Sequence, residues 1–288
     1  MDGGRFSAPH LHITPMTPEK NGMNPTWSAV ITTFNSAATI EAALDSIQSL
    51  SGQEQPADII VVDNLSQDNT VELVSNRHGV KLIAGSKNLG LARANNLGAE
   101  AARGEYLFFL NPDAIVLPGA VTALVRFSLS RPEAALLGPA MTDQNNVLQS
   151  TARTWPSLLS IAARRTGLGK TGSGRRALEK HLNLFNTDDP QPVHWLVGAA
   201  LWLTPRGRST VGLMNQAYFL YFEDVEWCRR AWIRGMEVWR VPEAVITHEC
   251  RRQSAGTSGR AARLHFRSMI RFFATHPSAI IGKGPGPS

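Results

Sequence analysis

The stretch that most constrains the fold is GEYLFFLNPD, residues 104–113, in which a short apolar run stops abruptly at polar residues. The aromatic-rich run 106–110 predicts a central strand of a sheet that is covered on both faces. Pro112 lacks an amide hydrogen and cannot continue such a strand, so Asp113 is expected at its carboxyl end. Open α/β sheets bind ligands at this edge, and a carboxylate there suits a hard metal ion bound to a nucleotide diphosphate. The alternative is an Asn-Pro-Asp turn that only ends the strand.

Upstream of this stretch, apolar strand-like runs alternate with segments of helical spacing. The predicted strands are 27–33, 58–62 and 80–83, and the predicted helices are about 39–50, 70–77 and 88–102. This alternation predicts a parallel sheet. The handedness of such connections places Asp63, which follows the second strand, at the same edge as Asp113. The structural alternative is that acidic residues simply favour the turns after strands.

Downstream, the pattern is less regular. We expect a helix over 117–129, a strand over 134–138 and then a mobile basic loop over 143–189. An apolar segment over 193–204 with a break at Gly198 and an aromatic strand over 218–222 follow. The last expected elements are a helix over 226–235, a strand over 236–241 that Pro242 ends, a short apolar run over 245–247 and a basic amphipathic helix over 261–275. Glycines at 167, 169 and 172 match a dinucleotide-loop spacing, but no apolar strand precedes them, so we reject that interpretation.

Composition limits the partners. The net charge of +6 and the pI of about 9.7 favour an anionic partner, which is a nucleotide sugar, an anionic lipid surface or a nucleic acid. Because no nucleic-acid-binding module is recognisable, we expect no nucleic-acid partner. Cys228 and Cys250 form no disulfide framework, which is typical of a reducing compartment. With no secretory signal and no run of 18 apolar residues, the expected location is cytoplasmic.

Four motifs together resemble the family-two glycosyltransferases, in their rhamnosyltransferase-like branch, from about residue 27 to 277. They are VITTFN (30–35) with IIVVDNLSQDNT (59–70), NLGLARANNLGAEAARGEYLFFLNPD (88–113), WLVGAALWL (195–203) with FLYFEDVEWCRRAWIRG (219–235), and ITHECRRQS (246–254). Each motif is modest alone, but their order and spacing carry the resemblance.

The resemblance implies an α/β GT-A fold, in which a Rossmann-like nucleotide-binding sheet has helices on both faces and an appended acceptor-binding region. We therefore expect a flexible arm over 1–26, a catalytic domain over 27–259, and a C-terminal amphipathic helix and tail over 260–288. The implied reaction is inverting, metal-assisted transfer of rhamnose or a related hexose from a nucleoside-diphosphate donor to a saccharide or lipid-linked acceptor, in cell-surface polysaccharide synthesis. The implied cofactor is Mg²⁺ or Mn²⁺.

The resemblance also assigns roles to residues. Asp113 and His248 are the expected metal ligands, and Asp224 is the expected base, with Glu223 orienting the acceptor. The expected donor-binding residues are Thr33, Asn35, Asp63, Asn88, Arg93 and Asn111.

Each of these roles has a structural alternative. Glu223 and Asp224 also suit an acidic N-cap of the following helix, His248 also suits a structural histidine, and Arg93 also suits a surface cation.

Two departures from the family pattern leave other functions open. Asn111 replaces the first acid of the metal motif, and the turn 212–216 lacks the usual acidic acceptor contact. A nucleotide-sugar-binding domain without catalysis is one alternative, and a nucleotidyltransferase is another.

The helix expected over 261–275 alternates bulky apolar residues with Arg263, Arg267 and Arg271. This pattern predicts peripheral contact with an anionic membrane, at the inner face of the cell membrane. The alternative is that its apolar face packs on the catalytic core.

Overall fold

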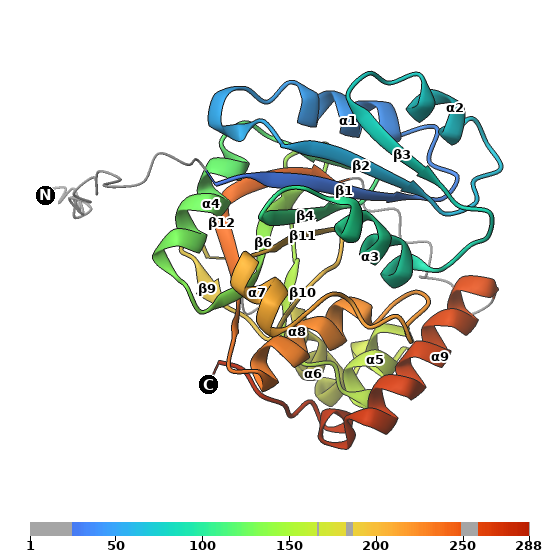
Figure 1. Ribbon diagram of the computed structural model, residues 1–288. Helices are drawn as coiled ribbons and strands as arrows, with labels where there is room; N and C mark the ends of the chain where they lie inside the picture. Colours follow the sequence, from blue (N-terminus) through green and yellow to red (C-terminus); the bar gives the residue numbers. More distant parts are fainter. Residues whose placement is uncertain (1–24, 166, 183–186, 249–258, 288) are drawn as a thin grey trace, which may run out of the picture.

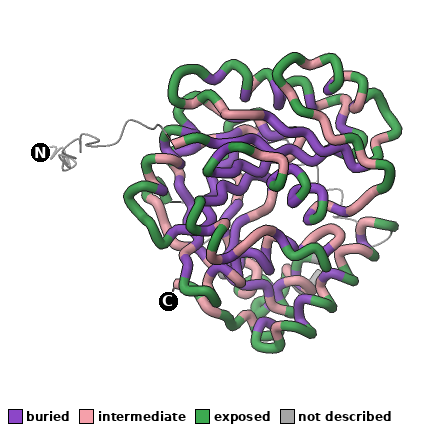
Figure 2. Tube along the Cα trace, viewed as in Figure 1, coloured by how far each residue is buried: buried purple, intermediate pink, exposed green. Residues whose placement is uncertain are grey.

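The computed structural model describes residues 25–165, 167–182, 187–248 and 259–287 of the 288-residue chain. The arm expected over 1–26 lies outside these ranges except for its last two residues, and Cys250 lies outside them as well. In Figure 1 a twisted sheet crosses the molecule, α1 and α2 lie above it, and α8 and α9 lie below it. Figure 2 shows that the strands at the centre are buried and that exposed residues lie on the surrounding helices and loops.

The main sheet has ten strands, in the order β3-β2-β1-β4-β11-β6-β12-β5, with β7 and β9 on its margins, and β8 and β10 form a separate pair. The strands are β1 (Trp27–Thr33), β2 (Asp58–Asp63), β3 (Val80–Ala84), β4 (Tyr106–Leu110), β5 (Ala114–Val116), β6 (Ala134–Thr142), β7 (Leu148–Gln149), β8 (Ala152–Arg153), β9 (Gln191–Pro192), β10 (Trp195–Leu196), β11 (Ala200–Leu203) and β12 (Glu237–His248).

The helices cover both faces of the sheet. They are α1 (Ile40–Gln48), α2 (Thr70–Ser75), α3 (Leu91–Ala101), α4 (Ala120–Ser130), α5 (Leu158–Arg165), α6 (Gly172–Leu182), α7 (Pro205–Thr210), α8 (Glu223–Ile233) and α9 (Arg260–Thr275), with short 3₁₀ helices at Gly52–Glu54, Gly167–Lys170 and Pro277–Ile280. None of the helices in the described ranges is long and apolar enough to cross a membrane.

The first half of the sheet is parallel, as expected. β1 pairs in parallel with β2 and with β4, so the residues after β2 and β4 share one edge. This confirms that Asp63 and Asp113 lie at the same edge. The second half is mixed, because β11 runs antiparallel to β4, and its Trp202 packs against Trp27 and Tyr106.

The side chains on the two faces of β4 belong to two different hydrophobic cores. Phe108 packs with β1 and with α1 and α4, whereas Phe109 packs with residues of α3, α8 and α9. This division follows from the strand geometry, because successive side chains point to opposite faces. The helix α9 takes part in the second core through Phe272, which is fully buried.

Three expected elements are wrong. The expected basic loop contains β7, β8, α5 and α6, and α6 buries His181 against Trp195. Short helices with several glycines have weak periodicity and depend on such tertiary packing.

The expected aromatic strand over 218–222 is a loop, in which Tyr221 and Phe222 have left-handed backbone angles with φ of 68° and 65°. Finally, Pro242 does not end the preceding strand, since β12 continues to His248 and Pro242 lies in a register shift between Val241 and Val245. An irregular position needs no ladder hydrogen bond, so proline is tolerated there.

Candidate active site

Three predicted residues meet beyond the end of β4. The Nε2 atom of His248 lies 3.2 Å from Oδ1 of Asp113 and 3.3 Å from Nδ2 of Asn111. Asn111 and Asp113 follow β4 directly, and His248 arrives as the last residue of β12, where it pairs with Ala114 of β5. Two segments more than 130 residues apart in the chain thus place a carboxylate and an imidazole side by side.

The pair Asp113 and His248 fits a divalent ion that is shared with a diphosphate. In the described part of the chain no group of three or more His, Cys, Asp or Glu residues forms a cage. Magnesium takes one or two protein ligands and fills its remaining positions with phosphate oxygens and waters. A carboxylate oxygen and an imidazole nitrogen in contact could serve as two ligands of such an ion.

Asp63 is the centre of a second polar network at the same edge. It is 2% exposed, and its carboxylate accepts hydrogen bonds from Thr33 Oγ1 at 2.9 Å and from the backbone N–H and side chain of Ser66 at 2.9 and 2.5 Å. The backbone N–H of Asn35 donates to the same Ser66 hydroxyl at 2.8 Å. Thr33, Asn35 and Asp63 are therefore brought together, and Ser66 is the member that sequence reasoning missed.

The remaining donor candidates lie on the segment that leads into α3. Asn88 accepts from the backbone N–H of Gly90 at 3.0 Å, and Asn64 accepts from that of Leu89 at 2.6 Å. Asn88 and Arg93 line a cavity between the start of α3 and α9. The wall of that cavity contains neither Asp113 nor any other member of the metal cluster, so the structure does not group Arg93 with the metal ligands.

Asp224 lies in the first turn of α8 and is joined to the metal motif through two residues of the chain. Its Oδ2 accepts from the backbone N–H of Gly198 at 3.0 Å, and the next carbonyl, of Ala199, accepts from the backbone N–H of Asn111 at 2.9 Å. A Cβ at position 198 would lie 3.3 Å from Oδ2 of Asp224, so glycine suits this close approach. Gly198, where a break in the apolar segment was expected, therefore positions the candidate base through its backbone N–H.

Glu223 and Asp224 differ in environment. Glu223 is 4% exposed, and its Oε2 has no hydrogen-bond partner among the described residues. Burial, followed by the charge of Asp224, raises the pKa of Glu223 to about 8. Burial also raises the pKa of Asp224, but the N–H groups of Val225 and Gly198 stabilise its anion.

A pKa of about 8 keeps the proton on Glu223 at neutral pH, while the two N–H groups favour the anion of Asp224 against the effect of burial. Neither residue is the N-cap of α8, which is Phe222, although both lie in the first turn, where the helix dipole favours anions.

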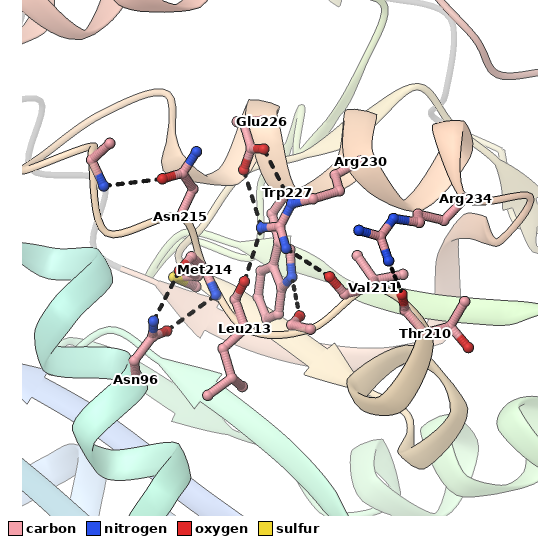
Figure 3. A network of polar contacts seen from close by, with 12 residues as sticks. Asn96, Thr210, Val211, Leu213, Met214, Asn215, Glu226, Trp227, Arg230 and Arg234 are labelled. Atoms are coloured by element: carbon pink, nitrogen blue, oxygen red, sulfur yellow. Dashed lines mark hydrogen bonds and ion pairs between the residues drawn. The ribbon is translucent and has the colours of Figure 1, made fainter.

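The turn over 212–216, which lies between α7 and α8 and lacks the acidic acceptor contact, is held by several hydrogen bonds (Figure 3). Arg230 donates to the carbonyls of Val211 at 2.7 Å and Leu213 at 2.8 Å and pairs with Glu226 at 3.1 Å. Asn96 of α3 bonds both the N–H and the carbonyl of Met214, at 3.1 and 2.9 Å. Sequence reasoning assigned neither Arg230 nor Asn96 to this turn.

The fold defines the class of protein. The structure of GalNAc-T7 with UDP, GalNAc and Mn²⁺ superposes with a TM-score of 0.62 at 17% identity, over 90% of this chain and 52% of the other. This chain therefore spans about half of that protein, and the likeness shows a GT-A glycosyltransferase fold.

Sequence comparison then gives the family. Residues 28–186 match Glycosyl transferase family 2, and the chain belongs to that family. It is 27% identical over 237 residues to the N-acetylglucosaminyl-diphospho-decaprenol L-rhamnosyltransferase of Mycobacterium tuberculosis, covering 78% of this chain and 77% of the relative. It is 22% identical to rhamnosyltransferase WbbL of Escherichia coli K12, covering 79% and 86% of the two chains. The resemblance to rhamnosyltransferase-like members of the family is thus confirmed, and the protein is a glycosyltransferase.

Proposed function

We propose that this glycosyltransferase moves rhamnose or a related hexose, with inversion, from a nucleoside-diphosphate donor to a saccharide or lipid-linked acceptor, in cell-surface polysaccharide synthesis. One observation carries the proposal. Gly198 and Ala199 join the candidate base Asp224 to Asn111, which lies against the candidate metal ligand His248. An in-line displacement of a diphosphate requires a base and an anion-stabilising site that are held in a fixed geometry. Here two consecutive backbone residues connect them.

The donor is assigned to the edge that Asp63 and Asp113 share. The network of Asp63, Thr33 and Asn35 contacts the base or ribose, and Asn88 and Asn111 are the further donor-binding residues of the proposal. Asp113 and His248 would hold Mg²⁺ or Mn²⁺. The ion, when bound, supplies positive charge that stabilises the leaving nucleoside diphosphate.

Asp224 takes the proton of the acceptor hydroxyl. The acceptor oxygen bonds to the anomeric carbon as the bond from that carbon to the diphosphate oxygen breaks, and the proton remains on Asp224. Asp224 is half-buried, so it is accessible to an acceptor and yet held by the Gly198 N–H. Protonated Glu223 is a hydrogen-bond donor and has the role of orienting the acceptor.

The helix α9 supports peripheral contact with the inner face of the cell membrane. It packs Phe272 and Phe273 into the core, as the alternative interpretation expects, but it leaves Phe266 57% and Ile270 52% exposed. These two residues lie one turn apart, beside the exposed Arg263. Bulky apolar side chains with cations suit the boundary of an anionic bilayer.

Calorimetric titration with a panel of nucleoside-diphosphate sugars, with and without Mg²⁺ or Mn²⁺, tests the donor assignment. We expect one nucleotide family to bind at least about tenfold more tightly with metal, and Asp113→Ala to remove that gain while the fold is kept. The absence of binding by any nucleotide sugar with either metal would overturn the proposal.

Two product assays separate the alternatives. An active glycosyltransferase hydrolyses its donor slowly without acceptor and releases nucleoside diphosphate, whereas a binding domain releases nothing. A nucleotidyltransferase would release pyrophosphate from a nucleoside triphosphate instead.

A further inference from the structure

We propose that Ser268 of α9 is a positioning residue for sugar transfer, because its hydroxyl holds the loop that leads into the candidate base. Residues 218–222 form this base loop, and Asp224 follows two residues after its end. The inference deepens the proposed function and rests on it for the role of Asp224. Because α9 lies beyond the catalytic domain expected over 27–259, this role extends the machinery of the reaction to the C-terminal helix.

The base loop has a backbone conformation that its own residues do not favour. Tyr221 and Phe222 have φ of 68° and 65°, in the left-handed region that bulky side chains rarely adopt. Such a conformation persists only where surrounding contacts enforce it, and it is typical of active sites. Here it leads the chain into α8 so that Asp224 accepts from the N–H of Gly198 at 3.0 Å. The contacts that hold the loop therefore also set where the base lies.

Three helices each hold one carbonyl of the base loop. The backbone N–H of Leu91, at the start of α3, donates to Phe219 at 2.7 Å, and a backbone N–H of α8 donates to Phe222 at 3.0 Å. Between them, the Ser268 hydroxyl of α9 donates to Leu220 at 2.8 Å, and Ser268 is 5% exposed. The donors from α3 and α8 are backbone groups, so among these three contacts the one from Ser268 is the one that a side chain decides.

The contact that Ser268 makes is unusual for a serine within a helix. Such a serine commonly donates to a carbonyl of its own preceding turn, as Thr275 of the same helix does. Ser268 donates to another segment instead. Three residues earlier, His265 packs its ring on Tyr221 and Phe222, with centroid separations of 5.3 and 5.2 Å. One face of α9 thus covers the base loop.

The opposite end of the base loop is fixed on the donor side. A Cβ at Gly90 would lie 2.4 Å from the carbonyl oxygen of Phe219, so the segment before α3 touches the loop through backbone atoms. This contact and the hydrogen bond from Leu91 remain when Ser268 is replaced. We therefore expect the loss of Ser268 to displace the half of the loop that leads to the base, and to lower turnover rather than donor affinity.

The test is Ser268→Ala, which removes the hydroxyl and keeps a strong helix former, so that α9 should form normally. Turnover is measured as nucleoside diphosphate released from the donor that binds best in the titration panel, in single turnover with protein in excess. Water then takes the place of the acceptor and needs the same base. We expect the rate to fall by about tenfold, less than the roughly 100-fold that a misplacement of about 1 Å can cost, with donor affinity within about threefold of the parent.

Ser128→Ala is the matched control. Ser128 of α4 is 7% exposed, donates to the carbonyl of Leu124 at 2.8 Å and accepts from Trp202 at 3.2 Å, so its loss removes at least as much hydrogen bonding. Trp202 belongs to the core that does not contain the base loop. A thermal melt should show both variants folded, and the rate of Ser128→Ala should stay within about twofold of the parent. Equal losses of rate in the two variants would overturn the role of Ser268.

A double-mutant cycle shows whether Ser268 acts through Asp224. If it does, Ser268→Ala should change the residual rate of Asp224→Asn by less than about twofold, because a base that is absent cannot be misplaced. Losses that multiply in the double variant, or a parent-like rate in Ser268→Ala, would overturn the inference. The proposed function is contradicted separately, by a parent-like rate in Asp224→Asn alone.

Discussion

At the scale of single residues, two adjacent carboxyl groups at the start of α8 have different partners and therefore different tasks. Asp224 accepts hydrogen bonds from Gly198 and Val225, which stabilise its anion, whereas Glu223 is buried with an oxygen that has no partner among the described residues. A positioned base acts on the chemical step, and its removal should leave donor binding intact.

Asp224→Asn keeps the side-chain volume and an acceptor oxygen for Gly198 but removes the basicity. We expect turnover to fall by at least about 100-fold, the lower end of what a general base contributes, with donor affinity within about threefold of the parent. Glu223→Gln should lose less turnover and mainly raise the KM for the acceptor. Steady-state kinetics with both substrates would show the roles to be exchanged if the Gln variant were the inactive one.

The raised pKa of Glu223 also makes a prediction about stability. The folded state holds this proton up to a pKa of about 8, whereas the unfolded chain releases it near 4.5, so the free energy of unfolding should fall as pH rises between these values. The limiting slope is about 1.4 kcal/mol per pH unit. Glu223→Gln cannot ionise, so its stability should increase relative to the parent from pH 5 to pH 8.5. Urea unfolding at both pH values measures this, and a constant difference would contradict it.

At the scale of elements, the turn between α7 and α8 is held by one arginine. Arg230 binds two carbonyls of the turn and Glu226, whose side chain is 9% exposed, so its removal leaves these buried acceptors without donors. We expect Arg230→Ala to cost about 2–4 kcal/mol of stability. Arg234→Ala, which loses one exposed hydrogen bond to Thr210, is the control and should cost under about 1 kcal/mol. Denaturant unfolding gives both values, and equal costs would show that the turn does not depend on Arg230.

At the scale of the whole molecule, the exposed face of α9 should decide membrane binding. The double variant Phe266→Ser/Ile270→Ser removes exposed apolar side chains without changing charge, and we expect at least about tenfold weaker sedimentation with phosphatidylglycerol vesicles. Leu129→Ser, which removes a 62% exposed leucine on α4, should behave like the parent. Parent binding should also weaken in 0.5 M salt, roughly three times the physiological ionic strength, because salt screens the arginines. Binding that is equal in all three proteins would exclude α9 as the contact.

Local sequence by itself determined the parallel half of the fold and most of the donor edge. Apolar runs of strand length alternate with helical periods, and polar residues follow β2 and β4 at one edge. These signals are short-range, since side-chain periodicity and the missing amide of Pro112 act within a few residues. The placement of Asp63 and Asp113 at the ends of their strands needed no knowledge of distant contacts.

Only the tertiary structure decided how distant segments meet. The left-handed backbone at Phe222, which replaced the expected strand, starts α8 so that Asp224 lies against Gly198. The cavity exists because α9 packs Phe272 into a core that it shares with α3. Burial of large side chains rewards contacts between segments over 100 residues apart, and local propensity contains no information about such contacts. The chemistry of each residue was therefore predictable from the sequence, whereas the assembly of base, metal ligands and cavity was a consequence of packing.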